Sequence, residues 1–254
     1  MALVGYKAIG PVTASSQATG ALSADPSAGD LVAVLVLWQA GGSETVSSIS
    51  DNASGNTYVA AGLQVDGPSL LHGIIYYAKN VATTTGFDVT VTMSGTVDLL
   101  RIGAVALSGR DTTSPLGVYG GQGQTDPGTA TDAITTGNIG TPSQDGHDIV
   151  AIGGMHANPD VFAVGTGFTG CGTFDNPKGA VEYKNQATAA AVAGTFTCDA
   201  TGTAYFISVG ASFAPPSGGG ATPAPGLGLG DWTGVAPAGI VTTTPTPVFF
   251  LRRR

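Results

Sequence analysis

Short runs of apolar and β-branched residues, separated by turn-forming residues, recur along the first half of the chain and predict β-strands. Residues 31–38 (LVAVLVLW) are apolar throughout, which indicates a buried strand. Residues 87–93 (FDVTVTM) alternate between apolar and polar positions, as a strand does. The residues DNASGN at 51–56 predict a hairpin turn that joins strands at 45–50 and 57–62. The other strands that we predict in this half lie at 71–81 and 99–109.

The same order of patterns recurs in the second half of the chain. Residues 146–156 (GHDIVAIGGMH) resemble the first buried strand and the turn before it. The segments that follow in the same order are 161–174, 179–202 and 205–213. We therefore predict two pseudo-repeated halves, at about 20–109 and 146–213, and read the four matching segments of each half as four strands in the same order. Two β units of similar pattern could also arise without duplication.

Two equivalent sets of antiparallel strands favour two sheets that pack face to face. We predict an all-β fold for residues 1–213, a jelly-roll-like antiparallel β-sandwich. Residues 1–30 are expected to add an edge strand and a loop. Residues 110–145 are expected to link the halves and to carry a strand of their own near 132–139.

The pattern changes after residue 213. Residues 214–230 are rich in proline and glycine and predict a linker. Residues 231–254 carry spaced apolar residues and three terminal arginines, and their prolines exclude a long helix. Disordered segments are usually poor in aromatic and β-branched residues, so we interpret 231–254 as an extended C-terminal docking arm, with a disordered tail as the alternative. The residues expected to bind a partner are Trp232, Ile240, Val241, Val248, Phe249, Phe250, Leu251, Arg252, Arg253 and Arg254.

An arm of this kind can add a strand to a neighbour's sheet edge or fill its grooves, while its arginines pair with carboxylates. We expect the partner to be a second copy of the chain, or another protein of the same assembly. Some exported surface proteins also end in an apolar span and a basic cluster. Here the span is interrupted by Gly, Thr and Pro and is too polar to cross a bilayer.

The composition supports a β-rich protein and argues against some classes of function. Charged residues make up only 10% of the chain, and there are 40 glycines. The net charge is −8, and residues 1–213 hold 16 acidic and 6 basic residues. An acidic body argues against nucleic-acid binding, because phosphate contacts need clustered Lys and Arg. The chain shows neither a secretory signal pattern nor an apolar run of about 18 residues, so we expect no membrane span.

Residue types that carry out catalysis are few and are not grouped in the sequence. The three histidines lack metal-ligand spacing. His147 and Asp148 follow a turn and are predicted to be a solvated pair at a strand end. The two glutamates are not marked as a glycosidase pair, and alternation predicts that Glu182 faces outward. No nucleophile elbow occurs, so we expect neither enzymatic activity nor a cofactor.

Two other features are weighed as binding sites. Cys171 and Cys198 are too few for a zinc site, and we interpret them as buried thiols, with a single disulfide as the alternative. The loop 51–56 is rich in side-chain oxygens but lacks the order of an EF-hand. A turn is therefore favoured over a calcium site.

Carbohydrate binding needs exposed aromatic side chains. Trp38 ends a buried strand and is expected in the core. Tyr76 and Tyr77 are adjacent in a strand, so they point to opposite faces of the sheet. One of them must face away from the core, which makes the pair a candidate glycan contact.

The segments SAGDLVAVLVLW, VSSISDNASGNTYVAA, FDVTVTMSG and RIGAVALSG together resemble a jelly-roll-like β-sandwich module of bacterial and tailed-phage genomes. The resemblance covers roughly residues 20–213 and rests on turn and core residues. It implies a virion or surface protein and supplies no catalytic residue. We therefore expect a structural virion protein of a tailed phage, such as a capsid decoration or a head- or tail-associated protein. The alternative is a carbohydrate-binding or adhesion module on a virion or cell surface.

Overall fold

The computed structural model describes residues 2–126, 132–156, 159–174, 178–200 and 203–216. Residues 1–219 form one compact unit, and the second unit, residues 220–254, lies outside the described residues. The described part is all-β: it contains β-strands and one short 3-10 helix, Pro68–Leu70, but no α-helix. The predicted fold class is therefore confirmed, while the jelly-roll order of strands stays a prediction.

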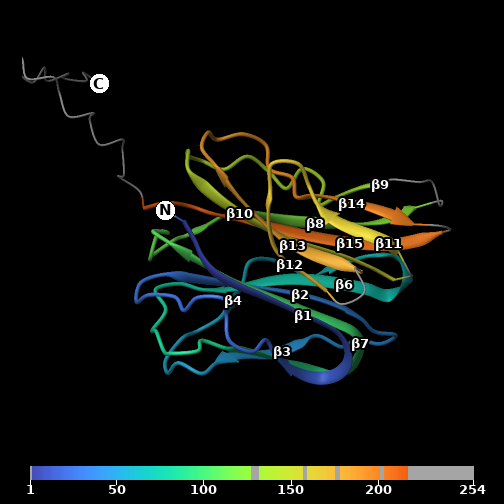
Figure 1. Ribbon diagram of the computed structural model, residues 1–254, viewed down its shortest axis with the longest axis horizontal. Coiled ribbons are helices and arrows are strands. Elements are labelled where there is room, and N and C mark those ends of the chain that lie inside the picture. Colours follow the sequence, from blue (N-terminus) through green and yellow to red (C-terminus); the bar gives the residue numbers. More distant parts are fainter. Residues whose placement is uncertain (1, 127–131, 157–158, 175–177, 201–202, 217–254) are drawn as a thin grey trace, which may run out of the picture. The chain divides into compact units, whose positions relative to one another are not determined.

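The strands follow one another along the two halves of the chain (Figure 1). Those of the first half are β1 (Ala2–Ala18), β2 (Leu31–Gln39), β3 (Val46–Asp51), β4 (Val59–Ala60), β5 (Val65–Asp66), β6 (Leu71–Ala78) and β7 (Val89–Ser108). Those of the second half are β8 (Leu116–Asp126), β9 (Asp132–Thr135), β10 (His147–His156), β11 (Pro159–Val164), β12 (Thr169–Thr173), β13 (Gly179–Gln186), β14 (Thr195–Ala200) and β15 (Ala204–Phe213).

These strands form three antiparallel sheets. The first sheet has the order β1-β7-β2-β6-β4, with β3 added beside β7 and β5 beside β6. The second sheet has the order β12-β13-β10-β15-β8, and the third has the order β11-β14-β9. The strand β1 pairs with β7 alone, which confirms the predicted edge strand.

The first sheet folds over itself because β1 and β7 are long and change layers along their length. The beginning of β7 pairs with β3 and with the end of β1, whereas its later part pairs with β2 and the beginning of β1. The bend lies near Leu99, which has a φ of 50°. A first-half core fills the fold, with Val34, Val36 and Trp38 of β2 against Val89 and other residues of β7. The predicted core position of Trp38 is thus confirmed.

The second half repeats these pairings with shorter strands. There, β14 takes the place of the beginning of β7 and β15 that of its later part. In the same way, β8 takes the place of the beginning of β1 and β9 that of its end. The strand β11 pairs with β14 as β3 pairs with the first part of β7. Each half therefore holds more strands than the four predicted. The segment 110–145, predicted to link the halves with one strand, contributes both β8 and β9 to the second half.

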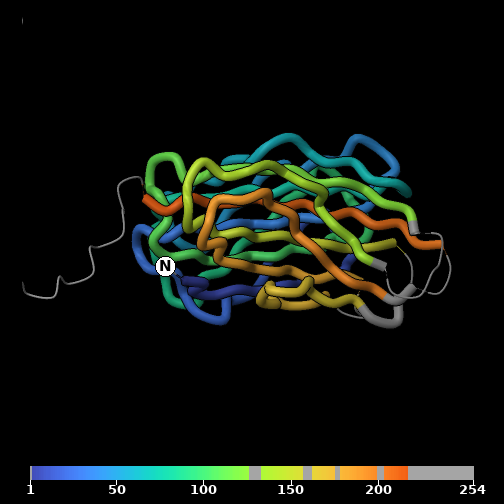
Figure 2. The backbone as a smooth tube through the Cα atoms, turned by 90° about the horizontal axis from the view of Figure 1, so that it is seen from above, coloured from blue at the N-terminus to red at the C-terminus, as the bar shows by residue number. Residues whose placement is uncertain are grey.

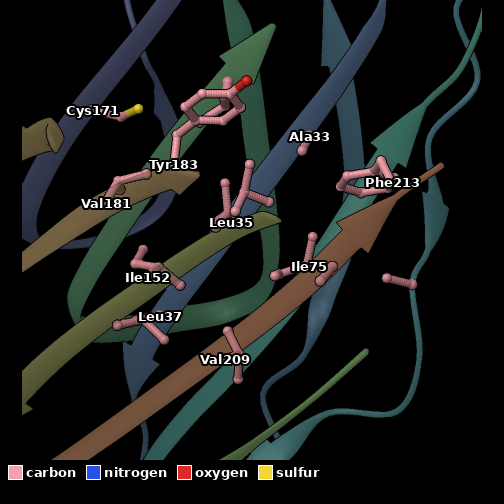
Figure 3. Packing of buried hydrophobic residues seen from close by; sticks show 14 of the residues in the cluster. Ala33, Leu35, Leu37, Ile75, Ile152, Cys171, Val181, Tyr183, Val209 and Phe213 are labelled. Atoms are coloured by element: carbon pink, nitrogen blue, oxygen red, sulfur yellow. The ribbon is translucent and has the colours of Figure 1, made fainter. Parts of the chain in front are cut away.

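The two halves pack through the face of the first sheet and the face of the second (Figures 1 and 2). Leu35 and Leu37 of β2 meet Ile152 of β10, Val181 of β13 and Val209 of β15 in this interface core (Figure 3). On its other face, the second sheet packs against the third sheet through a separate core. Both central sheets are therefore covered on both faces.

The hairpin predicted at 51–56 is wrong. The strand β3 pairs with β7 and β4 pairs with β6, so the loop crosses from one layer to another. The loop is held by the Asp51 carboxylate, which accepts hydrogen bonds from the Ala53 amide at 3.0 Å and the Tyr58 hydroxyl at 2.8 Å. Turn-forming residues thus mark a change of direction here, but not the partner strand.

A buried ion pair joins the two halves. Arg110, which follows β7, places its Nε 3.1 Å from Oδ2 of Asp148 in β10, with side chains 1% and 0% exposed. The hydroxyl of Tyr183 and the amide of Asn185 each donate to Oδ1 of Asp148 at 2.8 Å. Arg110 also donates to the carbonyl of Phe213 at 3.0 Å. The pair therefore fixes the end of the first half to three strands of the second.

Replacing Arg110 by Met should lower the free energy of unfolding by about 3–5 kcal/mol, because Asp148 would stay buried without its opposite charge. Adding Asp148→Asn removes that charge and should recover part of the loss. Denaturant unfolding of the wild type and of both variants measures this. A loss below about 1 kcal/mol for R110M would show that the ion pair does not hold the halves together.

Candidate functional site

Glu182 is completely buried between the second and third sheets. Its Oε2 accepts the amide of Gly165 at 3.0 Å and its Oε1 accepts the amide of Thr195 at 2.9 Å. The prediction that Glu182 faces outward into solvent is therefore wrong, because β11, β14 and β9 cover this face of β13. Burial raises the pKa of Glu182 to about 8, although the two amides and Lys184 act in the opposite direction. Both carboxylate oxygens accept backbone amides, so the side chain holds the residue after β11 and the first residue of β14 to β13.

His147 and Asp148 are also buried, with exposed fractions of 1% and 0%, so the predicted solvated pair is wrong. Nδ1 of His147 lies 3.1 Å from Oγ of Ser212, while Asp148 binds Arg110 and Tyr183. Adjacent residues in a strand point to opposite faces, so Asp148 does not orient His147 toward Ser212. The three residue types of a serine hydrolase are close in space, but they do not form its relay.

Arg101 is a buried cation that the sequence analysis missed. It lies in the later part of β7, is 0% exposed, and donates from Nη2 to the carbonyl of Met155 at 2.9 Å. Burial lowers its pKa to about 10. A single arginine inside the apolar run 99–109 was the available signal. This hydrogen bond to β10 is a second polar contact between the halves, beside the Arg110–Asp148 ion pair.

Both cysteines are buried, and the prediction of two buried thiols is confirmed. Burial raises the pKa of Cys171 to about 12, so its thiol is a poor nucleophile near neutral pH. Within the described ranges, the structure contains no group of three or more His, Cys, Asp and Glu side chains arranged to hold a metal ion. Nor does any helix of those ranges have the length and apolar character needed to span a membrane.

The two tyrosines proposed as glycan contacts do point to opposite faces, as predicted. Tyr76 packs against the first-half core, and Tyr77 packs against the interface core, with its ring 5.4 Å from that of Phe213. Both are half-buried, and burial raises the pKa of each hydroxyl. Because both faces of this sheet are covered, each ring is partly used in packing. The partner-binding residues predicted at 232–254 lie outside the described residues.

The surface feature that stands out is an exposed apolar edge along β4, β5 and the short helix. Val59, Leu63 and Leu70 are 44%, 87% and 54% exposed there. In this edge lies Asp66, whose side chain is 68% exposed. We call Val59, Leu63, Asp66 and Leu70 the apolar edge. No sequence pattern marked it, because a lone Leu in a loop gives no sign of its exposure.

In comparisons with protein-family models, curated proteins and solved structures, nothing matches this chain. The candidate site therefore depends on its geometry alone. Among the features described above, the buried ionisable groups hold the halves and layers together, and the apolar edge is the one available to a partner.

The raised pKa of Glu182 predicts a stability that depends on pH. The folded protein binds this proton more tightly than the unfolded chain, whose Glu has a pKa near 4.5. Stability from this group is therefore complete below about pH 4.5 and is lost as the pH rises through about 8. Denaturation midpoints measured from about pH 4.5 to 8.5 should fall in the wild type and fall less in Glu182→Gln. Glu44→Gln is the matched control, and an equal fall in wild type and E182Q would contradict the assignment.

Proposed function

We propose that this chain is a structural virion protein of a tailed phage, a capsid decoration or a head- or tail-associated protein. It would be made in the host cytoplasm and reside in the virion. The proposal is that it acts by assembly rather than by a reaction. Its partners would be further copies of itself or other virion proteins, reached through the C-terminal arm, residues 231–254.

The observation that carries the proposal is the apolar edge. Exposing a large apolar side chain to water is unfavourable, and Leu63 is 87% exposed. Burying it against a partner would therefore be favourable. Three of the four large exposed apolar side chains of the described residues lie between residues 59 and 70, and exposed apolar patches are typical of interaction surfaces. The arm supplies complementary chemistry, since it combines aromatic and aliphatic residues with three arginines on a chain of net charge −8.

The body suits such a role because it is held together at several levels. The interface core, the Arg110–Asp148 pair and Arg101 all join its halves. A body joined in this way can present its surface residues in a fixed arrangement. Symmetric assembly would then multiply weak individual contacts.

Deleting residues 231–254 should leave the body folded and abolish its incorporation into particles. The reason is that the core residues of the described part all precede residue 217. Circular dichroism and thermal unfolding test the fold, and copurification with capsids or tails tests incorporation. Full incorporation of the truncated chain would overturn the proposal. Scrambling residues 217–230, a change confined to the linker, is the control.

A second candidate function, glycan recognition, is favoured by a hydroxyl-bearing outer face. In the layer formed by β3, the end of β1 and the beginning of β7, Thr92 pairs with both Ser16 and Ser48, and Thr90 pairs with Ser50. The hydroxyls of Ser16 and Thr92 lie 3.3 Å apart. We call these five residues the hydroxyl face. Sugars are bound by hydrogen bonds of this kind, and the function could coexist with assembly.

Glycan-array binding would test the second candidate. If the hydroxyl face binds sugars, Thr92→Val should reduce binding about tenfold by removing a central hydroxyl while keeping side-chain shape. Deleting residues 231–254 should leave binding unchanged. Tyr76→Phe and Tyr77→Phe examine the tyrosines separately. Absence of binding by the wild type on a broad array would rule the candidate out.

A further inference from the structure

We propose that the apolar edge binds residues 248–254 (VFFLRRR) of a second copy of this chain. The inference rests on the proposed function and makes it specific, because it assigns both the donor segment and the acceptor surface. Each copy would give its own C-terminal residues to one neighbour and accept those of another. Such a head-to-tail contact closes into a ring when the rotation between copies allows it.

The chemistry of the two segments is complementary. The edge offers three exposed apolar side chains and one exposed carboxylate, that of Asp66. The donor segment offers Val-Phe-Phe-Leu followed by Arg-Arg-Arg. Arginine binds carboxylates through paired hydrogen bonds, and apolar contacts supply affinity beside them.

The Asp66 carboxylate is held in place for an incoming cation. Its Oδ1 accepts a hydrogen bond from Nε2 of Gln64 at 2.7 Å and lies 2.7 Å from Nδ1 of His72. These contacts lower the pKa of Asp66, so it is ionised at neutral pH. His72 in turn packs on Trp38, with ring centroids 5.4 Å apart, which anchors the group to the core. The carboxylate is therefore fixed, charged and still 68% exposed.

The backbone beside Asp66 is strained. Ser69 and Leu70 have φ values of 57° and 61°, in the left-handed region that bulky residues avoid. The Leu70 side chain is 54% exposed, so burial within this chain does not offset the strain. Such conformations cluster at functional sites and persist where the surrounding structure holds them; here Gln39 and Ala40 donate to the carbonyls of Ser69 and Leu70 at 2.9 and 3.1 Å. This turn presents the Leu70 side chain to solvent at one end of the apolar edge.

The pairing of β4 and β5 with β6 places the residues along the edge. Val59 lies opposite Tyr77 of β6 and Asp66 lies opposite His72, five residues away, so these two side chains point to opposite faces of the sheet. At the Val59 end the surface opens into a hollow of about 320 Å³ lined also by Thr57 and Lys79. A bound segment would therefore lie along the rim of the sheet, with its apolar residues beside Leu63 and Leu70 and its arginines near Asp66.

A second copy presenting its own apolar edge is a poorer occupant. A two-fold contact between two such edges would bring the two Asp66 carboxylates toward each other. Residues 1–213 hold 16 acidic and 6 basic residues, so a body offers few cations to relieve that repulsion. The terminal arginines are the densest cationic group in the sequence. Charge complementarity therefore favours the C-terminal segment.

The test uses the full chain and measures its mass by light scattering across a concentration series. Leu63→Ser should raise the dissociation constant of self-association about tenfold, because a highly exposed side chain contributes to the contact and not to the fold. Val12→Ser is the matched control, since Val12 is also exposed, at 37%, but lies in β1 away from the edge. Leu70→Gly should raise the thermal midpoint by relieving the positive φ while also weakening association. A purely structural Leu70 would not combine those two effects.

A charge exchange tests the pairing directly. Asp66→Arg should abolish association, and combining it with aspartates in place of Arg252, Arg253 and Arg254 should restore it. If L63S and D66R associate like the wild type while deletion of 231–254 abolishes association, the edge assignment is wrong and the assembly function stands. If the full chain stays monomeric at all concentrations, a second copy is not the occupant. A monomer in which L63S makes the arm more sensitive to protease would indicate binding within one chain, and would also overturn the proposal.

Discussion

The fold depends on two central sheets that are each covered on both faces. The first sheet packs on the second through the interface core, and each carries a further layer on its outer side. Strands in such a position read as continuous apolar runs, because neither face meets water. Every residue from Leu31 to Trp38 in β2 is buried, and so is nearly all of β10 and β15. The hydrophobic effect acting on these strands is therefore the main source of the stability of the body.

Close contact between the central sheets limits the side chains that the strands can carry. At Gly103 of β7, an added Cβ would lie 2.5 Å from Cγ2 of Val181 in β13, so a larger residue would push the sheets apart. Polar side chains in these strands cannot reach solvent and need partners inside the protein. Asp148 has its arginine, and Glu182 has two backbone amides. The buried charges are thus a consequence of the double coverage, and they join layers that packing alone would hold less specifically.

The sequence predicted the positions of most strands, because alternation and turn residues are local properties. It did not predict which strands pair. The hairpin expected around Asp51 failed because pairing in this fold joins segments far apart in sequence, such as β3 with β7. The burial of His147 and Glu182 was missed for a related reason: their exposure depends on a third sheet and on strands β8 and β15, which no local pattern reveals. The apolar edge was likewise invisible, since exposure of Leu63 is a property of the assembled fold.

The apolar edge combines exposed side chains with very short edge strands. Sheet edges are usually protected from unwanted pairing by short strands, charged side chains or covering loops. Here β4 and β5 are only two residues long, which limits backbone pairing with a neighbour. The apolar side chains around them remain exposed, however, and Asp66 is the carboxylate among them. An edge of this type disfavours the addition of a strand by a neighbour. It favours a partner whose side chains can pack on its exposed apolar residues. Under the assembly proposed above, recognition would depend on side-chain chemistry around β4 and β5, such as apolar residues and arginines of a partner segment.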